Sequence, residues 1–94
     1  MPPLPDNQIS EKLRTLDGWA REGDEIVKTF EFPSFPDAID FVTRVAGFAE
    51  AANHHPDLDI RYRKVRVALS THDEGGLTEK DFALATEIDA TAER

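Results

Sequence analysis

The sequence contains no cysteine, and this absence excludes several classes of site. Disulfides, thiolate zinc sites, iron–sulfur clusters and cysteine nucleophiles all need a sulfur that the chain lacks. No apolar run approaches the length of a membrane span. The start, Met1-Pro2-Pro3-Leu4-Pro5, lacks the basic and apolar regions of a signal peptide. We therefore expect a cytoplasmic protein with no membrane partner.

Positive charge is also scarce. The chain has 11 lysines and arginines against 19 aspartates and glutamates, a formal net charge of −8 at pH 7. Such a surface repels phosphate backbones and anionic lipids, so we expect no nucleic-acid partner. The chain does have 39% apolar residues in 94 positions, a composition typical of one small globular domain. We place this domain over residues 1–94, with residues 1–5 as a loose arm, and its modest core is compatible with oligomerisation.

The first part of the chain shows a short helix followed by two strands. Asp6 is a candidate cap for the helix, and Gly18 is its expected end. Alternating side chains predict strands over residues 19–22 and 25–32, joined by a turn at Gly23-Asp24. One face of the second strand should point at the core: Ile26, Lys28, Phe30 and Phe32.

A longer helix follows, and Ser34 is its candidate cap. Pro56 disfavours helical geometry at the preceding residue, so we expect this helix to end near His55. Its apolar stripe is the strongest periodic signal in the chain. The stripe consists of Ala38, Phe41, Val42, Val45, Phe48, Ala49 and Ala52.

Two further alternating runs, 58–62 and 65–69, predict a β-hairpin with a two-residue turn at Arg63-Lys64. In this register Tyr62 would face Val65, Ile60 would face Val67, and Leu58 would face Leu69. Continuing the ladder brings the chain around His55 close to the chain around His72.

A last helix begins after the Gly75-Gly76 bend. Thr78 and Asp81 have the spacing of a capping box. The apolar stripe of this helix is Phe82, Ala85, Ile88 and Ala92. The order α-β-β-α-β-β-α predicts an α+β fold, in which helices pack on one face of a four-stranded antiparallel sheet.

All three histidines lie in two short runs, Asn53-His54-His55-Pro56 and Ser70-Thr71-His72-Asp73. The hairpin would bring these runs together, and no other stretch groups side chains that titrate near neutral pH. Two carboxylates are expected nearby. Glu50 lies four residues before His54, on the same side of the helix if the helix persists, and Asp81 lies in the last helix. The pairing of the two runs is our active-site prediction.

Three interpretations of this cluster compete. The histidines could be structural, since a helix C-terminus favours an imidazolium, but their convergence with carboxylates argues against this. They could bind zinc, but adjacent His54 and His55 lack the spacing that presents two rings on one side. They could be metal-free acid–base catalysts, because an imidazole with a pKa of about 6.5 exchanges protons near neutral pH. Asp81 has two interpretations of its own, a capping role and a catalytic one. The residues alone lead to a hydro-lyase, an isomerase or a hydrolase.

Several segments together form a pattern that extends beyond the histidines. They are Gly18-Trp19, Phe30-Glu31-Phe32, Glu50-Ala51-Ala52-Asn53-His54-His55-Pro56, Ser70-Thr71-His72-Asp73, and Gly76-Leu77-Thr78 with Asp81. Over about residues 6 to 90, this pattern resembles the pterin-4a-carbinolamine dehydratase family. The His-His-Pro and Thr-His pair at this separation is its most specific part.

The resemblance implies an α+β fold and a metal-free dehydratase, which is a hydro-lyase. Such an enzyme converts 4a-hydroxytetrahydropterin to quinonoid dihydropterin and water, and so recycles the tetrahydropterin cofactor of aromatic amino acid hydroxylases. The resemblance implies no bound cofactor. It also implies a homodimer or homotetramer, because family members associate through sheet edges and helices.

The resemblance also assigns roles by position. His54 and His72 match the positions regarded as general acids for the leaving 4a-hydroxyl, and His55 matches the position that chiefly binds substrate. Glu50 and Asp81 would support the histidines or the amide and amino edge of the pterin. Four more residues would line the pocket: Asn53, Ser70, Thr71 and Asp73.

One alternative of another class remains. Some animal members of the family bind a homeodomain transcription factor as a dimerisation cofactor, and relatives with eroded sites act as assembly factors for the carbon-fixing carboxylase. This sequence keeps every histidine, which favours the enzyme. It departs from the family at the turn Arg63-Lys64, and it has Asn53 where an aspartate also occurs.

Overall fold

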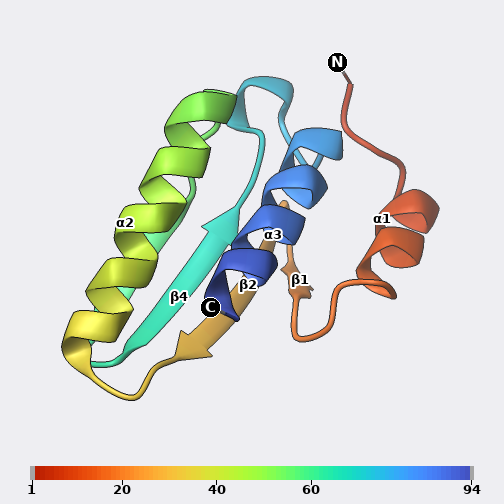
Figure 1. The fold of residues 1–94 in the computed structure, drawn as a ribbon. Coiled ribbons are helices and arrows are strands. Elements are labelled where there is room, and N and C mark those ends of the chain that lie inside the picture. The colour runs from red at the N-terminus through yellow and green to blue at the C-terminus, as the bar shows by residue number, and fades with distance from the viewer. Residues whose placement is uncertain (1, 94) are drawn as a thin grey trace.

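The computed structural model describes residues 2–93 and confirms the predicted α+β fold (Figure 1). Within this range the elements follow the predicted order, with one short 3-10 turn, η1, before the last helix. They are α1 (Asp6–Leu13), β1 (Ala20–Glu22), β2 (Glu25–Glu31), α2 (Phe35–Ala52), β3 (Asp57–Arg61), β4 (Lys64–Leu69), η1 (His72–Glu74) and α3 (Glu79–Ala92).

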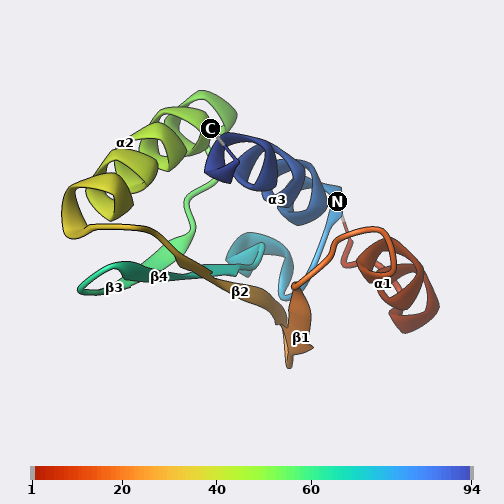
Figure 2. The same ribbon diagram turned by 60° about the horizontal axis from the view of Figure 1, so that its bottom comes forward.

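The strands form one antiparallel sheet in the order β1-β2-β4-β3. Figure 2 shows α2 and α3 over one face of this sheet, while α1 lies to the side near β1. The two central strands pair from Ile26 opposite Leu69 to Glu31 opposite Lys64. Ile26, Phe30 and Phe32 are buried in one cluster with side chains of α2 and α3, as the alternation of β2 predicts. The cluster takes in the predicted stripes of both helices except Ala52, which is exposed. The core therefore lies between the sheet and these two helices.

Helix α2 begins as predicted and ends early. The Ser34 hydroxyl accepts a hydrogen bond from the backbone N–H of Asp37 at 3.2 Å, so Ser34 is the cap. The helix ends at Ala52, before the predicted end near His55, because Asn53 takes the left-handed conformation with φ +50°. An asparagine at this position ends a helix efficiently, since it tolerates positive φ better than most residues.

The prediction for α1 is wrong at both ends. Pro5 is the cap residue, and its carbonyl accepts from the N–H of the third and fourth helical residues. Asp6 lies inside the first turn, where its carboxylate favours the positive end of the helix dipole and pairs with Arg21 at 2.9 Å. The helix stops at Leu13, five residues before Gly18.

The sequence predicted a loose arm over residues 1–5. In the structure, Leu4 packs against the core, and its N–H donates to the carbonyl of Leu77 at 2.8 Å. Pro3 lies against Gly76, so close that a Cβ on Gly76 would come within 3.2 Å of it. Residues 3–4 are thus attached to the segment that enters α3.

The hairpin register differs from the prediction by two residues. The turn is Tyr62-Arg63, and Ile60, not Tyr62, lies opposite Val65. Strand β2 accounts for the shift, because the carbonyl of Arg63 accepts from the N–H of Phe32 at 2.9 Å and its guanidinium donates back to the carbonyl of Phe32 at 3.2 Å. These contacts extend the β2–β4 pairing and leave Tyr62 exposed, with φ +56°. A slip of two residues keeps the same face toward the core, so the apolar pattern could not distinguish the two registers.

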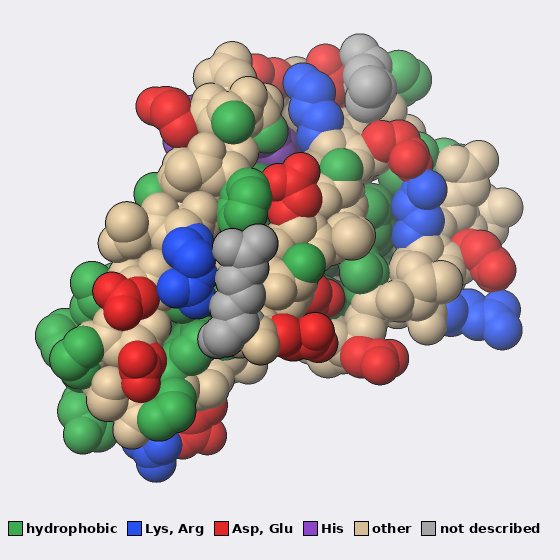
Figure 3. Space-filling model, viewed as in Figure 1, with side chains coloured by type: hydrophobic (Ala, Val, Ile, Leu, Met, Phe, Trp, Pro, Cys, Tyr) green, Lys and Arg blue, Asp and Glu red, His purple; other side chains and the backbone are tan. Residues whose placement is uncertain are grey.

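The surface mixes both signs of charge, with acidic side chains in excess (Figure 3). Hydrophobic side chains gather at the end of the molecule where α2 begins. The large apolar residues that are exposed belong to this end: Phe35, Ile60 and Tyr62.

Candidate active site

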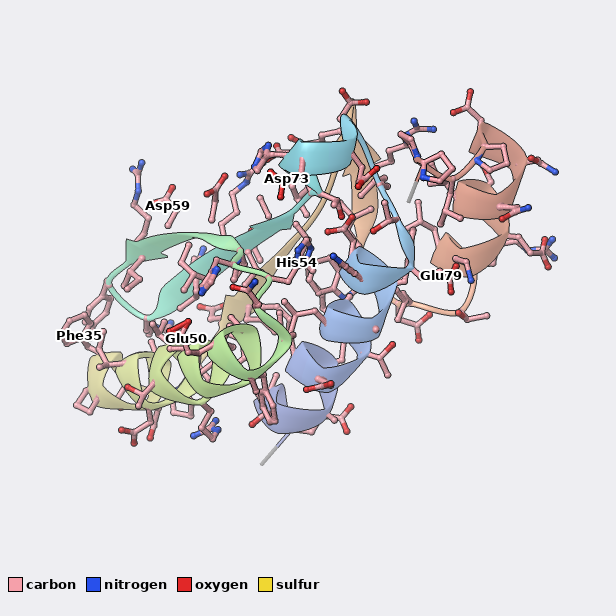
Figure 4. The ribbon with its side chains drawn as sticks, turned by 90° about the horizontal axis from the view of Figure 1, so that it is seen from above. Phe35, Glu50, His54, Asp59, Asp73 and Glu79 are labelled. Carbon is pink, nitrogen blue, oxygen red and sulfur yellow. The ribbon has the colours of Figure 1, made fainter. Side chains whose placement is uncertain are left out.

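A cleft of about 330 Å³ lies where the C-terminus of α2, the end of β4, η1 and the start of α3 meet. The structure places all three histidines and the other predicted pocket residues around it. The lining residues are Asn53, His54, His55, Ser70, Thr71, His72, Asp73 and Lys80. Figure 4 shows His54 between the end of α2 and the start of α3, and Asp73 on η1.

The left-handed turn at Asn53 orients the two adjacent histidines. The chain reverses there, and the N–H of His54 donates to the carbonyl of Ala49 at 3.0 Å, closing the helix. His54 then points inward, with its side chain 10% exposed, whereas the side chain of His55 is 60% exposed. His54 and His55 are adjacent in sequence but have different surroundings, so they can have different roles.

His54 pairs with a carboxylate that no solvent reaches. Its Nε2 lies 2.6 Å from Oδ1 of Asp81, whose side chain is 0% exposed. The other oxygen, Oδ2, accepts from the hydroxyl of Thr71 at 2.8 Å and from the N–H of Thr78 at 3.0 Å. A carboxylate that receives all these donors acts as an acceptor, so Nε2 of His54 carries a hydrogen and Nδ1 is left for other partners.

Asp81 caps α3, one of the two roles that the sequence offered, and it also contacts a histidine of the cleft. Its side chain accepts from the N–H of Thr78 and so completes the capping box of α3. The same carboxylate binds His54. Because Asp81 is fully buried and its two oxygens are occupied, it is not available to the amide edge of a substrate.

Glu50 binds His55 and not His54. Its Oε1 lies 2.9 Å from Nε2 of His55, and both side chains are mainly exposed. The sequence placed Glu50 beside His54 only if the helix persisted, and α2 stops at Ala52. An exposed pair of this kind orients a ring weakly, because water competes for both partners.

His72 has the opposite surroundings to His54. It is exposed on η1, and its ring makes no hydrogen bond to any residue between 2 and 93. Its backbone is held by a one-turn helix and by the bridge between Thr71 and Gly76, with N–H to carbonyl distances of 3.1 and 3.4 Å. The ring can thus present either nitrogen to a bound molecule.

Lys80 lines the cleft and was missed from the sequence. It is the one lysine or arginine among the described lining residues. It occupies the first turn of α3, where the helix dipole disfavours positive charge. This unfavourable placement, one residue before the capping-box aspartate, is the feature of the sequence that could have indicated Lys80 as a site residue.

Size alone does not single out this cleft. Two other hollows of about 320 Å³ exist, one between α1 and α3 and one around Lys28 and Asp89, and neither is lined by a histidine. Within residues 2–93, no three His, Asp or Glu side chains are arranged to hold a metal ion. No helix in the same range is long and apolar enough to cross a membrane. The choice of site therefore depends on its chemistry.

Comparison with known proteins identifies the family of the chain. A family model described as "Pterin 4 alpha carbinolamine dehydratase" matches residues 2–91. The chain belongs to that family. A Roseiflexus sp. (strain RS-1) protein named "Putative pterin-4-alpha-carbinolamine dehydratase" is 64% identical over 86 residues, 92% of each chain. A protein of the same name from Chloroflexus aurantiacus (strain ATCC 29366 / DSM 635 / J-10-fl) is 61% identical over 89 residues, 95% of this chain and 96% of the relative.

Two solved structures share the fold. One is a transcriptional coactivator/pterin dehydratase from Brucella melitensis, with TM-score 0.93 and 37% identity over 96% of this chain and 98% of that one. The other is a pterin dehydratase-like protein identified as a RuBisCO assembly factor in the alpha-carboxysome, with TM-score 0.69 and 26% identity over 80% of this chain and 89% of that one. Dehydratases are hydro-lyases, and the family assignment places this chain among such enzymes.

Proposed function

We propose that this protein dehydrates 4a-hydroxytetrahydropterin to quinonoid dihydropterin and so recycles a tetrahydropterin cofactor. The observation that supports the proposal is the convergence of His54, His55 and His72 on one cleft in a member of the dehydratase family. The volume of about 330 Å³ falls in the range that small-molecule sites occupy.

The reaction requires two proton movements. The bond from C4a to the hydroxyl breaks as the hydroxyl gains a proton, and the N5 electrons form the C4a=N5 bond as N5 loses its proton. Water is the only other product and the oxidation level of the pterin is unchanged, so the equation balances without a redox cofactor. Positioned imidazoles can supply both transfers, a contribution of about 10²- to 10⁴-fold in rate.

The three rings suit different parts of this task. His54 is buried against Asp81 and offers Nδ1, and the ring of His72, on η1, has no hydrogen-bond partner among residues 2–93. His55 is exposed and suits substrate binding. Because Asp81 is buried, other groups that line the cleft would bind the polar edge of the pterin. These groups are Asn53, Ser70, Asp73 and Lys80.

Turnover of synthetic 4a-hydroxytetrahydropterin tests the proposal. Wild-type protein should accelerate its loss, followed by absorbance, and the combined His54→Ala and His72→Ala variant should lose most of that acceleration. Lys12→Ala is the control, because Lys12 lies in the hollow between α1 and α3, away from the cleft. EDTA should leave the wild-type rate unchanged, which separates this mechanism from a zinc site.

Two outcomes would contradict the proposal. A folded double variant with the wild-type rate would remove the histidines from the mechanism. A folded wild-type protein that gives no acceleration would favour the second function. That function is a non-catalytic one on the same fold, as a coactivator or an assembly factor. The titles of the two solved structures name these roles for those proteins, the first beside pterin dehydratase.

We further propose that the protein is a cytoplasmic homodimer or homotetramer. The large apolar side chains exposed at one end of the molecule support this proposal, because isolated small domains usually bury such groups. These side chains are Phe35, Ile60 and Tyr62.

A further inference from the structure

The His72 ring depends on its backbone for its position. No described side chain holds the ring, so the spacing between His72 and His54 is set by whatever fixes the chain at the end of β4. The Thr71–Gly76 bridge and the single turn of η1 are local contacts within one small loop. They hold the loop together but do not connect it to the rest of the site.

The Thr71 side chain makes that connection. Its hydroxyl donates to Oδ2 of Asp81 at 2.8 Å and lies 2.8 Å from the hydroxyl of Thr78. Because the one hydroxyl hydrogen of Thr71 is directed to Asp81, Thr78 is the donor in the second contact. Thr78 in turn accepts from the N–H of Lys80 at 3.3 Å. Each hydroxyl in this chain of hydrogen bonds therefore accepts from one neighbour and donates to the next. The chain ends on the carboxylate of Asp81, which binds His54.

This network is buried, and it connects the loop after β4 with the start of α3 and with His54. Thr71, Thr78 and Asp81 are each 5% exposed or less. Buried hydrogen bonds of this kind specify one arrangement strongly, since a broken one leaves an unsatisfied polar group. His54 is bonded directly to Asp81, and His72 is the residue that follows Thr71.

We propose that Thr71 is a positioning residue that sets the distance between the His54 and His72 rings. This inference rests on the proposed function, and it gives a specific part to Thr71, which the resemblance placed only in the lining of the pocket. The hydroxyl is committed to Asp81 and Thr78, so Thr71 acts through the two histidines and not on the pterin. Thr71 still borders the cleft through its backbone.

Thr71→Val tests the proposal, since valine keeps the shape and removes the hydroxyl. We expect kcat to fall roughly 10- to 100-fold with little change in KM, because a displaced acid or base affects the chemical step more than binding. Thr71→Ser, which restores the hydroxyl, should recover most of the lost kcat. The Nε2–H tautomer of His54, seen in ¹H–¹⁵N spectra, should persist in Thr71→Val because Asp81 keeps that contact.

Thr91→Val is the matched control. Thr91 is equally buried, and its hydroxyl accepts from the guanidinium of Arg44 at 2.9 Å, at the far end of α3. This variant should lower the melting temperature while keeping kcat. If Thr71→Val does the same, the residue is merely structural and the proposal is overturned. A serine variant no more active than the valine variant would also overturn it.

The outcomes separate this inference from the proposed function. A wild-type protein without turnover contradicts the proposed function itself, whereas normal turnover in folded Thr71→Val contradicts only the role of Thr71.

A second test uses the wild-type protein alone and follows the hydroxyl proton of Thr71 by NMR. The hydroxyl proton of Thr71 should exchange slowly with solvent and show a nuclear Overhauser effect to Thr78, and rapid exchange would overturn the proposal.

Discussion

Asp81 illustrates how much one side chain can decide at the residue scale. Two donors, the hydroxyl of Thr71 and the N–H of Thr78, converge on Oδ2, while Oδ1 is left for His54. The two oxygens therefore have unequal surroundings. That inequality determines what happens when the carboxylate becomes an amide.

Asp81→Asn should reverse the tautomer of His54. The amide oxygen must take the place of Oδ2, because two donors meet there, and the amide nitrogen then faces Nε2. An amide NH₂ cannot accept, so Nε2 loses its hydrogen and Nδ1 gains it. We expect kcat to fall by up to about 10⁴, the loss that accompanies the wrong tautomer in a Ser-His-Asp triad. Steady-state kinetics and ¹H–¹⁵N spectra measure the two effects.

Asp89→Asn provides the comparison for this variant. Asp89 also accepts several hydrogen bonds, from the indole of Trp19 at 3.0 Å and from Lys28 at 2.8 Å, but it lies outside the cleft. Its amide variant should keep kcat. Full activity in Asp81→Asn, with the tautomer reversed, would show that the nitrogen facing the substrate does not matter.

At the scale of an element, the end of α2 has the largest effect on the site, because it orients two of the histidines. Asn53 leaves the helix with φ +50° and ψ +45°, and this one backbone conformation sends His54 inward and His55 outward. The sequence shows a stop before Pro56 but not the residue at which it occurs. Proline constrains only the residue before it, whereas the left-handed conformation is chosen by the packing of the segment that follows.

Asn53→Val should therefore destabilise the fold, because a β-branched residue in this conformation costs about 1–2 kcal/mol. Thermal unfolding should show a lower midpoint, by roughly 4–8 °C per kcal/mol for a domain of this size. Asn53→Gly should keep the wild-type midpoint, since glycine adopts positive φ freely. Equal midpoints in the two variants would show that this turn is unstrained. The activity of the glycine variant reports whether the asparagine side chain itself contacts the substrate.

The hairpin shows a second limit at the same scale. Alternation along 58–62 and 65–69 predicts two paired strands, and β3 and β4 confirm the pair. The alternation cannot choose between registers that differ by two residues, because both place the same side chains on the same face of the sheet. The contacts of Arg63 with Phe32, on a strand distant in sequence, make that choice.

At the scale of the whole molecule, aromatic packing joins the helical layer to the sheet. The ring of Phe41 on α2 lies 4.9 Å from that of Phe30 and 4.8 Å from that of Phe32, measured between ring centroids. Phe41 is fully buried, so its ring is part of the contact that holds the helical layer against the sheet.

Phe41→Ala should cost about 3–5 kcal/mol, the usual loss for an aromatic ring removed from a packed core. That is a large share of the roughly 5–15 kcal/mol by which small domains are stable. Urea unfolding measures the loss, and Phe41→Leu should show a smaller one because it leaves less empty volume. A loss below about 1 kcal/mol for the alanine variant would mean that the surrounding chain closes the cavity.

The sequence by itself determined the element order, the caps at Ser34 and Thr78, the family, and the meeting of the two histidine runs. These features depend on the periodicity of apolar residues and on contacts between residues close in sequence. A pattern along the chain can show both. Only the tertiary structure decided the hairpin register, the pairing of His54 with Asp81 and of His55 with Glu50, and the place of Lys80 in the cleft. Each of these depends on side chains that are distant in sequence and are brought together by packing. Each also depends on backbone turns that many different sequences can adopt. A pattern along the chain therefore cannot reveal them.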